Sequence, residues 1–190
     1  MNKAVFFDRD GTVIRNVHYN ADPGKVQLNT YAGASLRQLK KVGYKIIIVT
    51  NQSGIALGYF TQEQLGEVNK AMMRLLEKEG VSVDGLYYCP HYADGVISEY
   101  AITCDCRKPA PGMILQAARE CGIQLAGSWM VGDIADDITA GHRAGCSTIL
   151  LDPLGEEMRK IEMASLKDQQ PDYCAVDLQE AADIILSPFT

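Results

Sequence analysis

Two aspartates separated by one residue, Asp8 and Asp10, come directly after the apolar run at residues 4–7. Residues two apart in an extended chain point to the same side, so the two carboxylates would lie close together and each would raise the pKa of the other. A third aspartate, Asp133, ends another apolar run at residues 128–133. Oxygen ligands without sulfur or imidazole favour Mg²⁺, which would remove the repulsion. One carboxylate could then act as a nucleophile and another as a general acid and base.

Polar side chains that suit a phosphate group follow two more apolar runs. Thr50, Asn51 and Ser53 come at the end of the run 45–50 and could hold phosphate oxygens through hydroxyl, amide and backbone N–H groups. Lys108 could neutralise charge on the group being transferred. Each motif alone is common in turns and at helix ends. Their occurrence together, each after an apolar run, indicates a phosphoryl-transfer site.

A cysteine-rich segment separates the apolar run 85–89 from Lys108. Its spacing, C-x-H-x12-C-x-C, suits four ligands of a closed, tetrahedral Zn²⁺ site: Cys89, His91, Cys104 and Cys106. Such a site has no open position at which to activate water. We therefore expect zinc to fix the loop 89–106 and to direct Arg107 and Lys108, which follow it, toward the phosphate. The alternative is three unrelated thiols and a surface histidine, which the paired spacing disfavours.

These residues need strands that end at one edge of a sheet. Apolar runs alternate along the chain with segments of helical periodicity. The predicted strands are 4–7, 45–50, 85–89, 128–133, 147–151 and 173–176. The predicted helices are 31–43, 61–80, 111–121, 136–145, 156–166 and 178–186. This alternation predicts an α/β fold, a three-layer Rossmann-like parallel sheet with helices on both faces, whose ligands bind beyond the carboxyl ends of the strands.

Composition excludes several classes of protein. The 190 residues predict one domain spanning 1–190, and 47% hydrophobic with 22% charged residues is ordinary for a soluble protein. No apolar run approaches the roughly 18 residues of a membrane span, and the N-terminus does not read as a secretory signal. The net charge of −6 argues against nucleic acid as a partner. Six unevenly placed cysteines suit a reducing compartment, so we expect a cytoplasmic protein, and further a monomer.

The stretches FFDRDGTV, TNQSG, RKP and GDIADD resemble the four ordered motifs of the haloacid dehalogenase superfamily of phosphohydrolases, from residue 4 to about residue 151. The resemblance implies that Asp8 forms an aspartyl-phosphate. It also implies that Asp10 protonates the leaving oxygen, later activates water and binds Mg²⁺ through its backbone carbonyl. Thr50 would bind the phosphoryl group, and Lys108 would orient Asp8. The other implied positions are the metal ligands Asp133 and Asp137 and the phosphate neighbours Asn51, Gln52 and Ser53.

The pattern CPH…CDCRKPAPG is similar to a narrower group, the D-glycero-D-manno-heptose 1,7-bisphosphate phosphatases of bacterial heptose and lipopolysaccharide biosynthesis, with their histidinol-phosphate phosphatase relatives. The resemblance implies removal of the 7-phosphate from a small phosphorylated sugar, with Arg107 contacting the substrate. Residues 15–27 would form a small flap that carries Asn16 and Tyr19 as substrate contacts. No large cap insertion is visible in the sequence.

Two positions depart from the heptose group. Leu57 stands where a basic residue is usual, and Ile134 stands where a lysine often follows the aspartate of the fourth motif. Both changes remove positive charge near a doubly phosphorylated substrate and leave the phosphatase chemistry intact. Histidinol phosphate, another bisphosphorylated or nucleotide sugar, or another small phosphomonoester remains an alternative substrate. An alternative of a different class is a catalytically silent, zinc-stabilised binding module, against which the set Asp8, Asp10, Lys108 and Asp133 argues.

Overall fold

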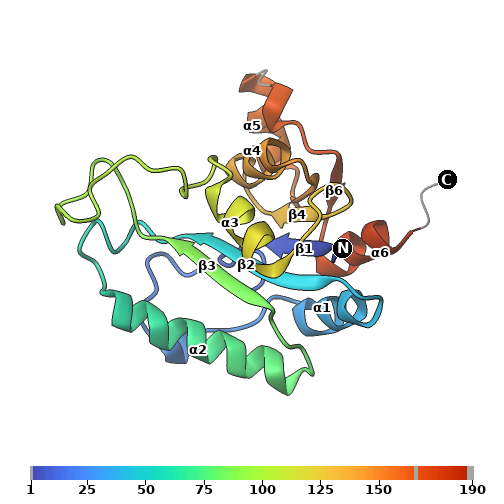
Figure 1. Cartoon of the computed structure of the whole chain (residues 1–190), viewed down its shortest axis with the longest axis horizontal. Coiled ribbons are helices and arrows are strands. Elements are labelled where there is room, and N and C mark those ends of the chain that lie inside the picture. The colour runs from blue at the N-terminus through green and yellow to red at the C-terminus, as the bar shows by residue number, and fades with distance from the viewer. Residues whose placement is uncertain (1, 165–166, 188–190) are drawn as a thin grey trace.

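The computed structural model describes residues 2–164 and 167–187 and shows a six-stranded parallel sheet between two layers of helices (Figure 1). The order of the strands across the sheet is β3-β2-β1-β4-β5-β6. The strands are β1 Ala4–Phe7, β2 Lys45–Asn51, β3 Gly85–Cys89, β4 Trp129–Gly132, β5 Ser147–Leu151 and β6 Tyr173–Ala175. The helices are α1 Ala32–Lys41, α2 Gln62–Lys78, α3 Gly112–Cys121, α4 Ala135–Ala144, α5 Glu156–Ala164 and α6 Leu178–Leu186, with short 3-10 helices η1 Pro23–Lys25 and η2 Lys167–Gln169.

The central strands are apolar along their whole length because helices cover both faces of the sheet. Every residue of β1 and β4 is buried, and β1 pairs with β2 on one side and with β4 on the other. The chain passes from β3 at one edge back to β4, so the strand order reverses between β1 and β4. In open α/β sheets, ligands bind at such a switch point, beyond the carboxyl ends of the strands.

The two helical layers each have their own core. Helices α1, α2 and α6 pack on one face of the sheet, and α3, α4 and α5 pack on the other (Figure 1). Members of the first core include Phe7, Leu36, Met72 and Ile185. Members of the second face include Phe6, Ile114, Ala140 and Ile161. These layers hold the strands rigidly and thereby fix the positions of the residues that follow β1, β2 and β4.

The structure confirms the predicted α/β fold, and the described strands and helices end within one or two residues of the predicted boundaries. The end of the predicted helix 156–166, at residues 165 and 166, lies outside the described part of the chain. Residues 15–27, which are predicted to form a flap, lie between β1 and α1 and contain η1. Among the described helices, none combines the length and apolar character that crossing a bilayer requires.

Candidate active site

Lys108 is buried between two carboxylates at the edge of the sheet. Its Nζ lies 2.5 Å from Asp8 Oδ1 and 2.6 Å from Asp137 Oδ1, and it donates to the carbonyl of Val49 in β2 at 3.0 Å. Burial alone would lower the pKa of Lys108, but the carboxylates of Asp137 and Asp8 outweigh burial and raise the pKa. The lysine is therefore charged, and it joins the residues after β1 to the first turn of α4.

Asp137 is the fully buried carboxylate that holds this lysine from the far side. Its Oδ2 accepts hydrogen bonds from the backbone N–H groups of Asp133 at 3.2 Å and Ile134 at 3.3 Å. A Cβ at Gly132 would overlap the Asp137 carboxylate, so a glycine is required where β4 ends. Asp137 thus fixes both Lys108 and the short loop that carries Asp133.

Three carboxylates gather beside Lys108. Asp8, Asp133 and Asp137 each offer an oxygen, and these oxygens all lie within 4.8 Å of one another. Burial raises the pKa of Asp8 to about 8 and the pKa of Asp133 to about 7, and the neighbouring carboxylates add to both shifts. One lysine does not balance this much negative charge. The all-oxygen donor set and its unbalanced charge fit a Mg²⁺ ion.

The turn after β1 brings the backbone against Asp133. Gly11 has φ +91°, in the left-handed region that favours glycine, and a Cβ there would overlap the Asp133 carboxylate. Asn29 braces the same turn by donating its amide to the carbonyls of Gly11 at 2.7 Å and Thr12 at 2.9 Å. The close approach of the two strand ends therefore depends on the glycine of the DxDGT motif.

Asp10 contacts a different set of donors. Arg9 Nε lies 3.0 Å from Asp10 Oδ2, and Arg9 Nη2 lies 3.1 Å from Asp10 Oδ1. Gln52 donates its amide to Asp10 Oδ2 and to Thr50 Oγ1, both at 2.9 Å. Thr50 Oγ1 lies 3.5 Å from Asp10 Oδ2. The predicted general acid therefore lies among residues at the carboxyl ends of β1 and β2.

A cavity of about 140 Å³ opens beside Asp10, between the flap and the loop after β2. Its lining includes five of the predicted substrate contacts, Asn16, Tyr19, Asn51, Gln52 and Ser53. It also includes Asp10 itself with Arg9 and His18, and apart from Asp10 it carries no carboxylate among the described residues.

A larger cavity of about 550 Å³ opens on the other side of Asp133, toward β5 and α5. Its acidic lining residues are Asp133, Asp152, Glu156, Glu157 and Asp177, accompanied by Lys160. A surface with this excess of carboxylates repels a phosphate dianion. The smaller cavity beside Asp10 is therefore the better place for a phosphorylated sugar.

The backbone of Lys108 is tied to β2, whereas Arg107 contacts the cysteine-rich loop. Asn51 exchanges two hydrogen bonds with the Lys108 main chain, both at 3.0 Å. The Arg107 guanidinium lies 5.1 Å from the ring centre of Tyr92 and donates to the carbonyl of His91 at 3.3 Å. Arg107 is absent from the lining of the 140 Å³ cavity, so its contact with substrate stays a prediction.

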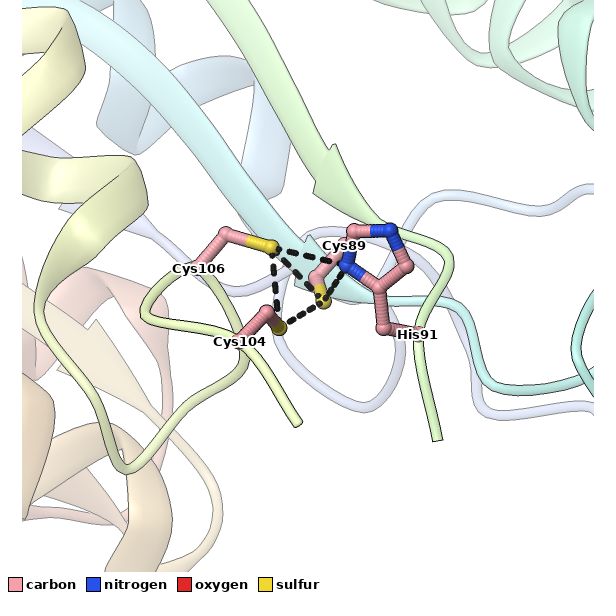
Figure 2. A group of neighbouring side chains, drawn as sticks. All are labelled: Cys89, His91, Cys104 and Cys106. Carbon is pink, nitrogen blue, oxygen red and sulfur yellow. Dashed lines mark hydrogen bonds between the residues drawn. The ribbon is translucent and has the colours of Figure 1, made fainter. Parts of the chain in front are cut away.

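The four predicted zinc ligands converge just beyond the end of β3. Figure 2 shows the sulfur atoms of the three cysteines and one ring nitrogen of His91 turned toward one another. Cys106 Sγ lies 3.0 Å from Cys89 Sγ, 3.2 Å from Cys104 Sγ and 3.4 Å from His91 Nδ1. The contact between Cys89 and Cys106 lowers the pKa of Cys106 to about 5 and raises the pKa of Cys89, so Cys106 is the member of the pair that favours the metal-binding thiolate form. Three sulfurs and one nitrogen fit a closed tetrahedral zinc site.

Three residues near the site were not predicted from the sequence: Arg9, Asn29 and Asn69. Asn69 lies in α2 and accepts a hydrogen bond from Arg9 Nη1 at 2.7 Å. The contacts of Asn29 and Asn69 join segments far apart in the chain, which local patterns do not reveal. Arg9 carries one local signal, because an arginine beside an aspartate is able to bind its carboxylate with two N–H groups.

The class of protein to which the chain belongs is shown by a family model and by a solved structure. The HAD-hydrolase-like family model matches residues 105–181. The crystal structure of D,D-heptose 1,7-bisphosphate phosphatase from B. bronchiseptica, complexed with magnesium and phosphate, matches with a TM-score of 0.82 at 30% identity, covering 97% of this chain and 98% of that one. The fold, a parallel sheet between two layers of helices with an acidic site at the switch point of the sheet, is that of a HAD-like hydrolase.

Similar sequences show which family of HAD-like hydrolases the chain belongs to. The D-glycero-beta-D-manno-heptose-1,7-bisphosphate 7-phosphatase of Yersinia pestis is 44% identical over 148 residues, 78% of this chain and 79% of the relative. The D-glycero-alpha-D-manno-heptose-1,7-bisphosphate 7-phosphatase of Photorhabdus laumondii is 39% identical over 143 residues, 75% of this chain and 78% of the relative. The chain belongs to the family of heptose-1,7-bisphosphate 7-phosphatases, which confirms the resemblance inferred from its motifs.

Proposed function

We propose that the protein removes the 7-phosphate of D-glycero-D-manno-heptose 1,7-bisphosphate. The observation that carries the proposal is Asp8, Lys108 and Asp133 gathered at one sheet edge in a chain of this family. The B. bronchiseptica relative was crystallised with magnesium and phosphate. Membership of this family supports the heptose bisphosphate as the substrate. The gathered carboxylates support phosphate hydrolysis as the reaction.

Magnesium bound at this site would supply positive charge that offsets the phosphate and the carboxylates. Asp8, Asp133 and the backbone carbonyl of Asp10 would hold it, with Asp137 as a fourth proposed ligand. Asp137 already contacts Lys108 and two backbone N–H groups, so its larger effect is to hold the other members of the site in position.

The side chains divide the reaction between them. An oxygen of Asp8 attacks phosphorus, and Asp10 gives a proton to the departing sugar oxygen and later takes one from water. Thr50, Asn51, Gln52 and Ser53 hold the phosphoryl group, and Lys108 keeps Asp8 oriented and offsets charge on the transferring group. Asn16 and Tyr19 face the sugar, and Arg107 is the proposed contact to the remainder of the substrate.

Zinc held by Cys89, His91, Cys104 and Cys106 would have a structural role. The loop between the two pairs of ligands would otherwise be anchored mainly by main-chain contacts such as Tyr92 N–H to Tyr100 O at 3.1 Å. Fixing Cys106 also fixes Arg107 and Lys108, which follow it.

The proposal is tested by incubating the protein with the heptose bisphosphate, in both anomeric forms, with and without Mg²⁺. Phosphorus NMR identifies which phosphate is released. We expect Mg²⁺-dependent loss of the 7-phosphate and no turnover by Asp8→Asn, which should keep the wild-type circular dichroism spectrum. Preferential hydrolysis of histidinol phosphate in a parallel assay, or release of the 1-phosphate, would contradict the proposal.

A further inference from the structure

Arg9 is a buried cation whose position the chemistry above does not explain. Its side chain is among the largest that the structure buries completely, with 1% of its surface exposed. The guanidinium reaches Asp10 through Nε and Nη2 and reaches Asn69 of α2 through Nη1, at 2.7 Å. A buried ion pair is often no more stabilising than apolar residues of the same volume. Stability alone is therefore a weak reason for an arginine here.

The two carboxylate oxygens of Asp10 differ in the number of hydrogen-bond donors around them. Oδ2 has Arg9 Nε at 3.0 Å, Arg9 Nη2 at 2.9 Å and Gln52 Nε2 at 2.9 Å, with Thr50 Oγ1 at 3.5 Å. Oδ1 has Arg9 Nη2 at 3.1 Å as its hydrogen-bond donor among the described residues. A carboxylate oxygen accepts about two hydrogen bonds in its plane, so Oδ2 is saturated and Oδ1 keeps a free lone pair.

We infer that Arg9, held from α2 by Asn69, is the positioning residue that fixes the plane of the Asp10 carboxyl group and leaves Oδ1 as the oxygen that carries the proton. The inference rests on the proposed function. When Asp8 forms its bond to phosphorus and the bond from phosphorus to the sugar oxygen breaks, that oxygen takes the proton from Asp10 Oδ1. When water then attacks phosphorus, its proton goes to Asp10 Oδ1, the bond from Asp8 to phosphorus breaks, and inorganic phosphate leaves.

The arrangement requires an arginine and a rigid support. A planar guanidinium engages two carboxylate oxygens at once, whereas a lysine ammonium is a point charge that does not set the plane of its partner. The support is α2, whose residues on either side of this position, Val68 and Met72, are fully buried against the sheet. Asn69 therefore presents its carbonyl oxygen to Arg9 from a fixed place.

The dependence of the rate on the leaving group tests this inference. A sugar alkoxide is a poor leaving group that needs a proton, whereas p-nitrophenolate leaves without one. The quantity to compare is kcat/KM, because it covers the steps up to the first transfer of phosphoryl to Asp8. For Arg9→Lys and Asn69→Leu we expect kcat/KM on the heptose bisphosphate to fall about 10- to 100-fold, a partial loss of the roughly 10²- to 10⁴-fold that general acid catalysis contributes, while kcat/KM on p-nitrophenyl phosphate changes less than about 3-fold.

Matched variants separate positioning from folding. Asn69→Asp keeps an oxygen acceptor for Arg9. Its kcat/KM on the heptose bisphosphate, relative to that on p-nitrophenyl phosphate, should therefore fall less than that of Asn69→Leu. Lys70→Leu alters the next residue of α2, whose ammonium contacts Glu67 at 2.8 Å, and should leave both rates unchanged. Asn69 is only half-buried, so its variants test the inference even if Arg9→Lys does not fold. Equal losses on both substrates, or no loss, would overturn the inference, whereas a wild-type protein inactive on every phosphate would instead overturn the proposed function.

Discussion

The ammonium nitrogen of Lys108 lies 2.5 Å from Asp8 Oδ1, which joins the residue after β1 to a residue that follows the cysteine-rich loop. The same nitrogen lies 2.6 Å from Asp137 Oδ1, so one buried cation is shared by two buried carboxylates. The contact links the predicted nucleophile, the first turn of α4 and the loop after β3. A substitution at any one of these three places should therefore shift the residues at the other two.

Lys108→Met should destabilise the protein as well as inactivate it. Removing one partner of a buried ion pair leaves uncompensated charge, which costs about 3 kcal/mol or more of the free energy of unfolding. Lys160→Met is the matched control, because the exposed ammonium group of Lys160 pairs with Glu157 at 2.8 Å and its loss should lower the free energy of unfolding far less. Urea unfolding at pH 7.5 measures both. Equal stability of the two variants would show that Lys108 does not hold the acids together.

Asp133→Asn should stabilise the magnesium-free protein above pH 7 while weakening its response to magnesium. Burial raises the pKa of Asp133 to about 7, so ionising this carboxyl group costs folding free energy. The cost is absent below the unfolded pKa near 4, accumulates as the pH rises toward 7 and is complete above it. The difference in Tm between variant and wild type should therefore grow between pH 4 and pH 8.

Added magnesium should reverse the order of stability. Wild-type protein gains RT ln(1 + [Mg²⁺]/Kd) on binding, whereas Asp133→Asn has lost a ligand and gains less. Thermal melts at pH 8 are compared in magnesium-free buffer and in 10 mM MgCl₂, roughly a saturating concentration if Kd lies near or below 1 mM. Strong chelators are avoided because they would also remove zinc. A variant that responds to magnesium as the wild type does would contradict the assignment of Asp133 as a ligand.

Tyr59→Ala should weaken substrate binding through the flap. The ring of Tyr59 lies 4.6 Å from the ring of Tyr19, which lines the cavity beside Asp10 and has a left-handed backbone conformation with φ +48°. Such a conformation is unfavourable for tyrosine and needs support from its neighbours. An aromatic pair contributes about 0.5–1.5 kcal/mol, so KM should rise about 2- to 12-fold with little change in kcat.

Tyr59→Phe keeps the ring and serves as the control for that measurement. Steady-state kinetics on the heptose bisphosphate should give it a KM within about 2-fold of the wild type, since the pairing of the rings is retained. If Tyr59→Ala also kept the wild-type KM, the contact between the two rings would have no part in forming the substrate site.

Much of the site followed from one local rule, that polar residues after apolar strands of a parallel sheet meet at one edge. Asp8, Thr50 and Asp133 obey it because β1, β2 and β4 are buried neighbours in the sheet. Arg9 and Asn69 do not obey it. Their contact depends on where α2 crosses the sheet, which is decided by side-chain packing between segments sixty residues apart.

The four residues proposed to bind zinc could be grouped from the sequence for a different reason. Metal coordination imposes a pattern of residue types and spacings on the chain itself, so Cys89 and Cys106 could be paired from the sequence. The direction of Arg107 could not. Its guanidinium lies over Tyr92, a residue within the same loop, and that contact depends on how the whole loop folds.

Cys104→Ala should remove zinc and lower both stability and activity. Cys104 Sγ lies 3.2 Å from Cys106 Sγ and 3.5 Å from Cys89 Sγ, so its loss leaves three ligands where a closed site needs four. The loop then loosens, and Lys108, two residues after Cys106, loses its fixed approach to Asp8. Zinc content by mass spectrometry and a thermal melt measure the two effects. Cys174→Ala, which changes an exposed cysteine outside the cluster, should keep zinc and Tm. A Cys104 variant that stayed zinc-replete and fully active would refute the structural zinc site.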